Sequence, residues 1–157
     1  MNLLALNLIL ALVWALATGS LSELNLALGF VVGMGVLHVA GAAVGDRRYA
    51  VRIVRALQLL AIFVRELVVS SVRVAADVLS PTLHMRPAVI AVPLDVTSDA
   101  EITLLANLIS LTPGTLSIDV ADDASCLYVH AMYGGDPDAL AKDIKTTFEV
   151  RVAEVFR

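Results

Sequence analysis

Side chains capable of chemistry are few in this 157-residue sequence, and their spacing is poor for catalysis. Asp122 and Asp123 are adjacent in a predicted turn, so their side chains diverge and do not converge on one ligand. Cys126 and His130 lie four residues apart on one predicted strand, and the strand rise separates their side chains by roughly 13 Å. These two residues therefore cannot form a catalytic dyad.

The remaining nucleophiles and bases form no catalytic motif either. His84 stands alone near Pro81, and no base is adjacent in sequence to Ser110, Ser117 or Ser125. The chain contains no nucleophile elbow, phosphate-binding loop or dinucleotide fingerprint. The sequence thus predicts no enzyme, no cofactor, and no catalytic or metal-binding residues.

Composition indicates a membrane protein with a small part outside the bilayer. Hydrophobic residues make up 59% of the chain and charged residues 17%, whereas soluble domains carry about 25% charged residues. A net charge of −4 gives no general attraction to nucleic acid, and the single Cys126 cannot form an internal disulfide. Residues 47–86 hold seven arginines against two acidic residues, and residues 87–157 hold eleven acidic residues against four basic ones. This division predicts a basic border between an apolar membrane part and an acidic soluble domain.

Two apolar runs predict a transmembrane α-helical hairpin over residues 1–46. The spans, about 1–18 and 24–44, approach the length that a bilayer core requires, and polar residues 19–23 form the turn. A cleaved signal peptide is the alternative for the first run, but no Lys or Arg precedes it and a second span follows at once.

The predicted spans contain packing residues and no ion-conducting ones. Glycines four residues apart let helices approach closely in lipid, and the predicted helix-packing residues are Gly29, Gly33, Gly41 and Gly45. His38 is the one titratable side chain inside either span, and intramembrane carboxylates or lysines usually mark ion pathways. The chain is therefore not expected to carry ions by itself.

Residues 47–84 predict a basic linker and one long amphipathic helix from about Val51 to Leu79. At about 100° per residue its polar side chains share one arc. They are Arg52, Arg55, Gln58, Arg65, Glu66, Ser70, Arg73 and Asp77. Such a helix suits the plane of the membrane surface, although a third span with its polar stripe on a partner is the alternative.

The predicted membrane-surface residues are Arg47, Arg48, Arg52 and Arg55. With two spans, these arginines hold their side of the membrane in the cytoplasm, and the C-terminal domain follows them there. With three spans the domain would lie outside.

Residues 85–157 predict a small cytoplasmic βαββα domain. An apolar strand opens it, and Ser98 with Glu101 forms a capping box at the start of a helix. The alternating runs 115–121 and 127–131 predict a β-hairpin, and a capped amphipathic helix closes the domain. The predicted fold class is a membrane α-helical hairpin followed by an amphipathic helix and this small α/β domain.

One stretch resembles the signature of a known family. It runs from Leu104 to Val120 through Leu111-Thr112-Pro113-Gly114-Thr115, and Leu127-Tyr128-Val129-His130-Ala131 follows it. It is similar to the E subunit of the Mrp-type (Mnh, Sha or Pha) multisubunit cation/proton antiporters. The resemblance implies a multi-pass protein of the bacterial plasma membrane, in a complex that exports Na⁺ in exchange for protons. Its implied partners are the other antiporter subunits and the lipid bilayer, without nucleic acid.

The resemblance implies an accessory subunit that supports assembly and function, since the large subunits of that family move the ions. In the matching stretch, we expect an assembly or structural role for Asn107, Thr112, Pro113 and Gly114. A helix end leaves carbonyls unpaired, so Asn107 and Thr112 could satisfy them or reach a neighbouring subunit. A plain helix stop is the alternative for these residues. For the whole chain, the alternative is a self-standing membrane-tethered α/β protein that senses a ligand or binds a regulator.

Overall fold

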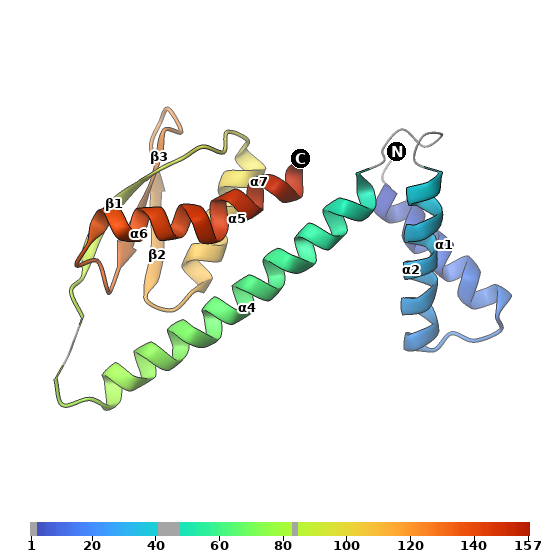
Figure 1. Cartoon of the computed structure of the whole chain (residues 1–157), viewed down its shortest axis with the longest axis horizontal. Helices are drawn as coiled ribbons and strands as arrows, with labels where there is room; N and C mark the ends of the chain where they lie inside the picture. The colour runs from blue at the N-terminus through green and yellow to red at the C-terminus, as the bar shows by residue number, and fades with distance from the viewer. Residues whose placement is uncertain (1–2, 41–47, 83–84) are drawn as a thin grey trace. The chain divides into compact units, whose positions relative to one another are not determined.

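The computed structural model describes residues 3–40, 48–82 and 85–157, and the chain divides into two compact units, Met1–Val54 and Arg55–Arg157 (Figure 1). The first unit contains α1 (Leu3–Ala17), α2 (Glu23–Val39) and the start of α4 (Tyr49–Leu79). The rest of α4 belongs with the sheet of the second unit.

The turn between α1 and α2 is fastened by side chains from both helices. Gly19 has a φ of +68°, a left-handed conformation that favours glycine. The Ser22 hydroxyl caps α2 by accepting from the Asn25 N–H at 3.3 Å. The Asn25 amide in turn donates to the Thr18 hydroxyl at 2.6 Å and accepts from the Trp14 indole at 3.2 Å. The two helices therefore pack as an antiparallel pair.

The membrane spans predicted at 1–18 and 24–44 are not confirmed. Across residues 3–40, 48–82 and 85–157, no helix is both long enough and apolar enough to cross a membrane. The end of the second predicted span, together with Gly41, Gly45 and Arg47, lies outside the described residues.

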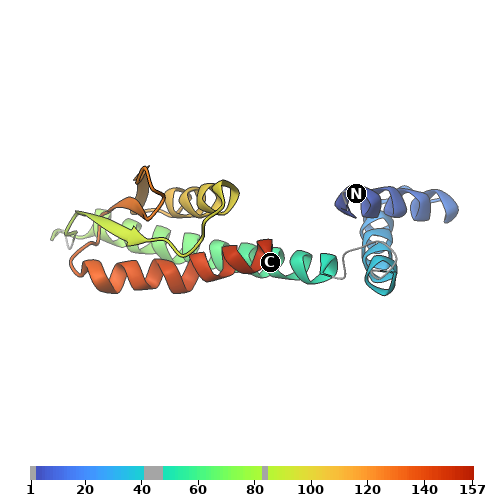
Figure 2. The same ribbon diagram turned by 90° about the horizontal axis from the view of Figure 1, so that it is seen from above.

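The second unit is built on a three-stranded antiparallel sheet with strand order β1-β3-β2. Its strands are β1 (Ala88–Pro93), β2 (Thr115–Val120) and β3 (Cys126–Ala131). Its helices, besides α4, are α5 (Asp99–Leu111), α6 (Pro137–Ile144), the π-helical segment η1 (Lys145–Glu149) and α7 (Val150–Phe156). The order strand, helix, strand, strand, helix predicted for residues 85–157 is present, and Figure 2 shows this unit from above.

One face of the sheet carries the hydrophobic core. Alternate side chains of β1 and β3 point into it and pack against α5 and the last helix. The buried members include Ile90, Val92, Leu105, Ile109, Leu127, Val129, Phe148 and Val152. Leu59 of α4 joins the same cluster, and Phe63 packs against it, so α4 is part of this core.

The alternation predicted for β2 is present, but its apolar side faces outward. Leu116 and Ile118 are 53% and 54% exposed, whereas the Ser117 hydroxyl faces α5 and donates to one of its carbonyls. A register shift between Ser117 and Asp119 then reverses the alternation, so Val120 packs against the core.

The last helix is continuous, but it differs from the regular helix predicted. Five residues, Lys145–Glu149, form a π-helical turn between α6 and α7. Ile144, Phe148 and Val152 still lie buried on one side. Short π segments inside helices are frequent at functional sites, and this one carries the polar side chains of Lys145, Thr147 and Glu149.

Candidate functional site

Helix α4 lies lengthwise against the C-terminal domain. Near one end the Arg55 guanidinium donates to the Glu154 carbonyl at 2.8 Å, and near the other the Tyr133 hydroxyl donates to the Asp77 carboxylate at 2.6 Å. Between them, Leu59 is only 5% exposed. Arg55 and Asp77 are separated by roughly 33 Å of helix, so the contact extends along most of α4.

A cavity of about 160 Å³ lies where α4 meets the end of α5 and the π-helical turn. Its wall combines polar side chains of α4 with the Thr112–Thr115 turn and with residues of the last helix. The polar lining residues are Glu66, Ser70, Arg73, Thr112, Thr115, Tyr133, Asp143 and Thr147. The stretch that resembles the family signature therefore borders the junction with α4.

The end of α5 is closed by hydroxyl groups of the predicted motif. The Thr112 hydroxyl donates to the Leu108 carbonyl at 2.8 Å, and the Thr115 hydroxyl donates to the Ile109 carbonyl at 2.7 Å. Gly114 has a φ of +92°, which allows the sharp exit toward β2. Thr112 thus satisfies a helix-end carbonyl, one of the two roles expected for it.

Asn107 and Pro113 occupy different surroundings. Asn107 is exposed on α5, directly before the last turn of that helix, whereas Pro113 is half-buried in the cavity wall. The structure thus brings Thr112, Pro113 and Gly114 together and leaves Asn107 on the surface.

Tyr133 is the junction residue that the sequence did not reveal. The hydrogen bond to Asp77 raises the pKa of its phenol, and burial and the charge of Asp77 add to this, although the positive charge of Arg73 opposes it. The Arg73 guanidinium lies 5.6 Å from the centre of the Tyr133 ring, within cation–π range. Asp77 is 56 residues away in sequence, so no local pattern could have indicated this contact.

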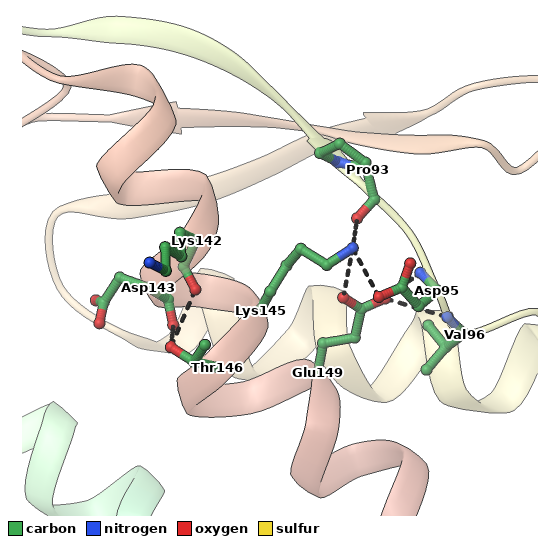
Figure 3. A network of polar contacts seen from close by, with 8 residues as sticks. All are labelled: Pro93, Asp95, Val96, Lys142, Asp143, Lys145, Thr146 and Glu149. Carbon is green, nitrogen blue, oxygen red and sulfur yellow. Dashed lines mark hydrogen bonds and ion pairs between the residues drawn. The ribbon is translucent and has the colours of Figure 1, made fainter.

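A second polar cluster connects the π-helical turn to the end of β1 (Figure 3). The Glu149 carboxylate is 3% exposed and accepts from the backbone N–H groups of Asp95 at 2.5 Å and Val96 at 3.1 Å. The Lys145 ammonium lies 2.9 Å from the Asp95 carboxylate and 3.5 Å from that of Glu149, and it donates to the Pro93 carbonyl at 2.9 Å. Lys145 and Glu149 are four residues apart, a spacing that is visible in the sequence.

Opposite charges dominate the ionisation of Lys145. Burial alone lowers the pKa of its ammonium group, but the hydrogen bond to Asp95 and the negative charges of Glu149 and Asp95 outweigh this. The pKa of Lys145 therefore lies above its usual value. We call this cluster of Lys145, Asp95 and Glu149 the Lys145 clamp, because it joins the last helix to the end of β1.

Two of the predicted packing glycines lie against α1 of the same chain. A Cβ on Gly29 would come within 2.9 Å of the Ala11 carbonyl oxygen, and a Cβ on Gly33 would overlap with the Asn7 amide oxygen. The buried Asn7 amide donates to the Tyr49 hydroxyl at 3.0 Å, which attaches the start of α4 to this pair of helices. These two glycines therefore allow α2 to pack closely on α1 of the same chain.

The predicted membrane-surface arginines differ in exposure. Arg48 is exposed, while Arg52 and Arg55 are half-buried. Part of the Arg55 guanidinium is engaged by the Glu154 carbonyl. Their contact with a membrane remains a prediction.

The hydrogen bonds and ion pairs of the two polar clusters join elements of this chain to one another. Within residues 3–40, 48–82 and 85–157, no three His, Cys, Asp or Glu side chains converge to hold a metal ion. Cys126 and His130 lie on β3, both part-exposed on the face of the sheet opposite the core.

Comparison with known proteins gives matches over nearly the whole chain. A family model described as Na⁺/H⁺ ion antiporter subunit matches residues 7–155. The E subunit of the Na⁺/H⁺ antiporter of Alkalihalophilus pseudofirmus is 37% identical over 150 residues, covering 96% of this chain and 95% of that protein. The Bacillus subtilis protein of the same name is 38% identical over 152 residues, covering 97% and 96%.

Two solved structures contain similar chains. A chain of the Mrp complex from Dietzia sp. DQ12-45-1b is 30% identical, with a TM-score of 0.50 over 65% of this chain and 94% of that one. A chain of a membrane-bound sulfane sulfur reductase, an archaeal respiratory membrane complex, is 22% identical, with a TM-score of 0.61 over 98% of both chains. The second likeness shows a shared fold alone.

Proposed function

The chain belongs to the family of Na⁺/H⁺ antiporter E subunits, and on that basis we propose that it is an accessory subunit that supports assembly and function of the antiporter without carrying ions. It is a component of a multisubunit antiporter, and its partners are the other subunits of that complex. In this proposal the exchanged cation is Na⁺, because its relatives are named as Na⁺/H⁺ antiporter subunits.

The small number of titratable side chains in α1 and α2 is the observation that carries this proposal. Between Leu3 and Ala40 the titratable side chains are Glu23, at the turn, and His38. The buried polar side chain of the pair, Asn7, donates to Tyr49, and its amide oxygen lies against Gly33. Ion pathways in membranes are lined by carboxylates, lysines or converging polar groups, so these helices suit a packing role.

In this proposal α1 and α2 are the two membrane-crossing segments of a bacterial plasma membrane protein. Their outer surface is apolar, with Leu8, Leu12 and Leu16 all exposed. The arginines that begin at Arg47 favour the cytoplasmic side by the positive-inside rule, which places the C-terminal domain in the cytoplasm.

The C-terminal domain serves in this account as a docking body without catalytic function. Its polar side chains at the α4 junction and at the Lys145 clamp are engaged in fastening elements to one another. Asn107 is exposed on α5, which supports a contact between this residue of the family-like stretch and another subunit.

Purification of the tagged full-length chain from its native membrane in mild detergent tests the proposal. We expect the large multi-span antiporter subunits to co-purify in fixed proportion. Recovery of the chain alone, with those subunits present in the same extract, would contradict it and favour the self-standing membrane-tethered protein.

A further inference from the structure

The two sides of α4 are used in opposite ways. Its polar side is turned toward the C-terminal domain, where Arg55 and Asp77 make hydrogen bonds and Glu66 and Ser70 line the cavity. Amphipathic helices of soluble domains usually do the reverse, burying the apolar stripe and exposing the polar one. The uncovered side of this helix therefore needs a different explanation.

The uncovered side is a continuous apolar face. Its side chains recur every three or four residues, and all of them are exposed. We define the apolar face of α4 as Leu57, Leu60, Ala61, Val64, Val68, Val72, Ala75 and Leu79. Ser71 is the polar residue among them, and its hydroxyl is turned back onto the Leu67 carbonyl at 2.6 Å. An exposed apolar patch of this length marks a surface that meets lipid or another protein.

The arginine that borders this face favours a lipid surface. Arg65 lies beside the apolar face with 71% of its side chain exposed, and it pairs with Glu66 on the domain side. Arginine side chains extend along apolar surface while their guanidinium groups reach anionic headgroups, an arrangement typical of helices in the membrane interface.

We propose that the apolar face of α4 binds the lipid bilayer surface, so that α4 lies in the membrane plane and carries the C-terminal domain on its polar side. The contact at Asp77–Tyr133 and the contact at Arg55–Glu154 hold the helix along the domain at both ends. A helix held in this way cannot also cross the bilayer, because its polar side would have to leave the domain. The chain then has two spans and one interfacial helix.

Depth-dependent fluorescence quenching on the full-length chain in vesicles tests this inference. In a Cys126→Ser background, single cysteines at Leu57, Val64, Val68 and Val72 are labelled with bimane. The vesicles contain anionic lipid and phospholipid brominated at either a shallow or a deep acyl position. Leu12→Cys in α1 reports membrane insertion, and Asp122→Cys, in the β2–β3 turn on the side of the domain away from α4, is the control (Figure 1).

We expect all four positions of the apolar face to be quenched equally, more by the shallow bromines, and at least roughly twofold more than Asp122→Cys. A spanning helix would instead give deep quenching at Val64 and Val68 and shallow quenching at Leu57, which would overturn the inference. Disulfide cross-links between copies at Val64→Cys without quenching would overturn it in favour of self-association. Quenching that disappears in the intact antiporter complex would reassign the face to another subunit.

The inference rests on the membrane attachment proposed above, and the Leu12→Cys probe separates the two. Quenching at Leu12→Cys without quenching on α4 would overturn the interfacial helix alone. Absence of quenching at both would contradict the membrane-crossing hairpin as well.

Discussion

Tyr133, just after the last strand, donates a 2.6 Å hydrogen bond to Asp77, near the end of α4 and 56 residues earlier in the chain. This bond fixes one end of α4 on the sheet domain, as the Arg55–Glu154 bond fixes the other. Together the two bonds hold α4 with its polar side against the domain and its apolar side exposed.

The Tyr133–Asp77 bond predicts a stability change at high pH. The pKa of Tyr133 in the folded chain is raised above the value of about 10 for an unfolded tyrosine. The bond therefore contributes its full stabilisation below about pH 10, and the contribution is lost as the pH rises through the raised pKa. The melting temperature of Tyr133→Phe should lie below that of wild type by a constant amount up to about pH 10. The two melting temperatures should converge as the pH rises through the raised pKa of Tyr133. A difference already absent at neutral pH would refute the contact.

The Lys145 clamp predicts a large loss of stability when its buried acid is removed. Glu149→Ala leaves two backbone N–H groups and a lysine without their carboxylate, and we expect the free energy of unfolding to fall by about 3 kcal/mol. Lys142→Ala, on the exposed side of the same helix, should have little effect. Denaturant unfolding of the full chain in detergent measures both. Equal effects of the two substitutions would argue against the clamp.

Close packing of α1 on α2 predicts that three glycines of α2 differ in their tolerance of alanine. Gly29→Ala should separate the helices because its Cβ meets the Ala11 backbone, and Gly33→Ala should displace Asn7 from Tyr49. Gly35→Ala is the control, because no atom lies within 4 Å of its Cβ position. Yield and melting temperature of the detergent-purified chain should fall for the first two variants alone. A loss at Gly35→Ala equal to theirs would contradict the packing account, because alanine is the better helix former and its Cβ meets open space there.

The stretch from Asn107 to Gly114 predicts two separable effects. Thr112→Val leaves the Leu108 carbonyl without its hydroxyl partner and should lower the free energy of unfolding by about 1 kcal/mol. Asn107→Ala should leave folding unchanged, since the side chain is exposed, but reduce co-purification of the antiporter subunits. Unfolding curves and pull-down yields of the same variants distinguish the effects. Normal co-purification by Asn107→Ala would leave this residue without a role in assembly.

Local patterns in the sequence predicted the elements of the fold better than their faces. The Ser98–Glu101 capping box and the cap of the last helix, which Asp136 provides, form as expected, and strands form over both alternating runs, because each depends on neighbours within a few residues. The register shift after Ser117, which turns Val120 into the core while Leu116 and Ile118 stay exposed, cannot be read from alternation alone.

The contacts of the candidate site were beyond the reach of local patterns. Glu149 and Asp95 are 54 residues apart, and Asn7 and Tyr49 are 42 apart, so only the tertiary fold brings them together. The amphipathic division of α4 was visible in the sequence, but not which side meets the domain. That choice depends on Tyr133 and Glu154, which lie far along the chain.

Na⁺-dependent proton movement in vesicles, normalised to the amount of assembled complex, tests the central claim most directly. Strains that lack this protein, or carry Gly29→Ala or Asn107→Ala, are compared with wild type, and the complex is quantified on native gels. An accessory role predicts that antiport falls in proportion to complex yield, while the rate per complex and the Na⁺ concentration for half-maximal rate stay unchanged. A changed Na⁺ dependence at normal complex yield would contradict the account, because it would place this chain in the ion path.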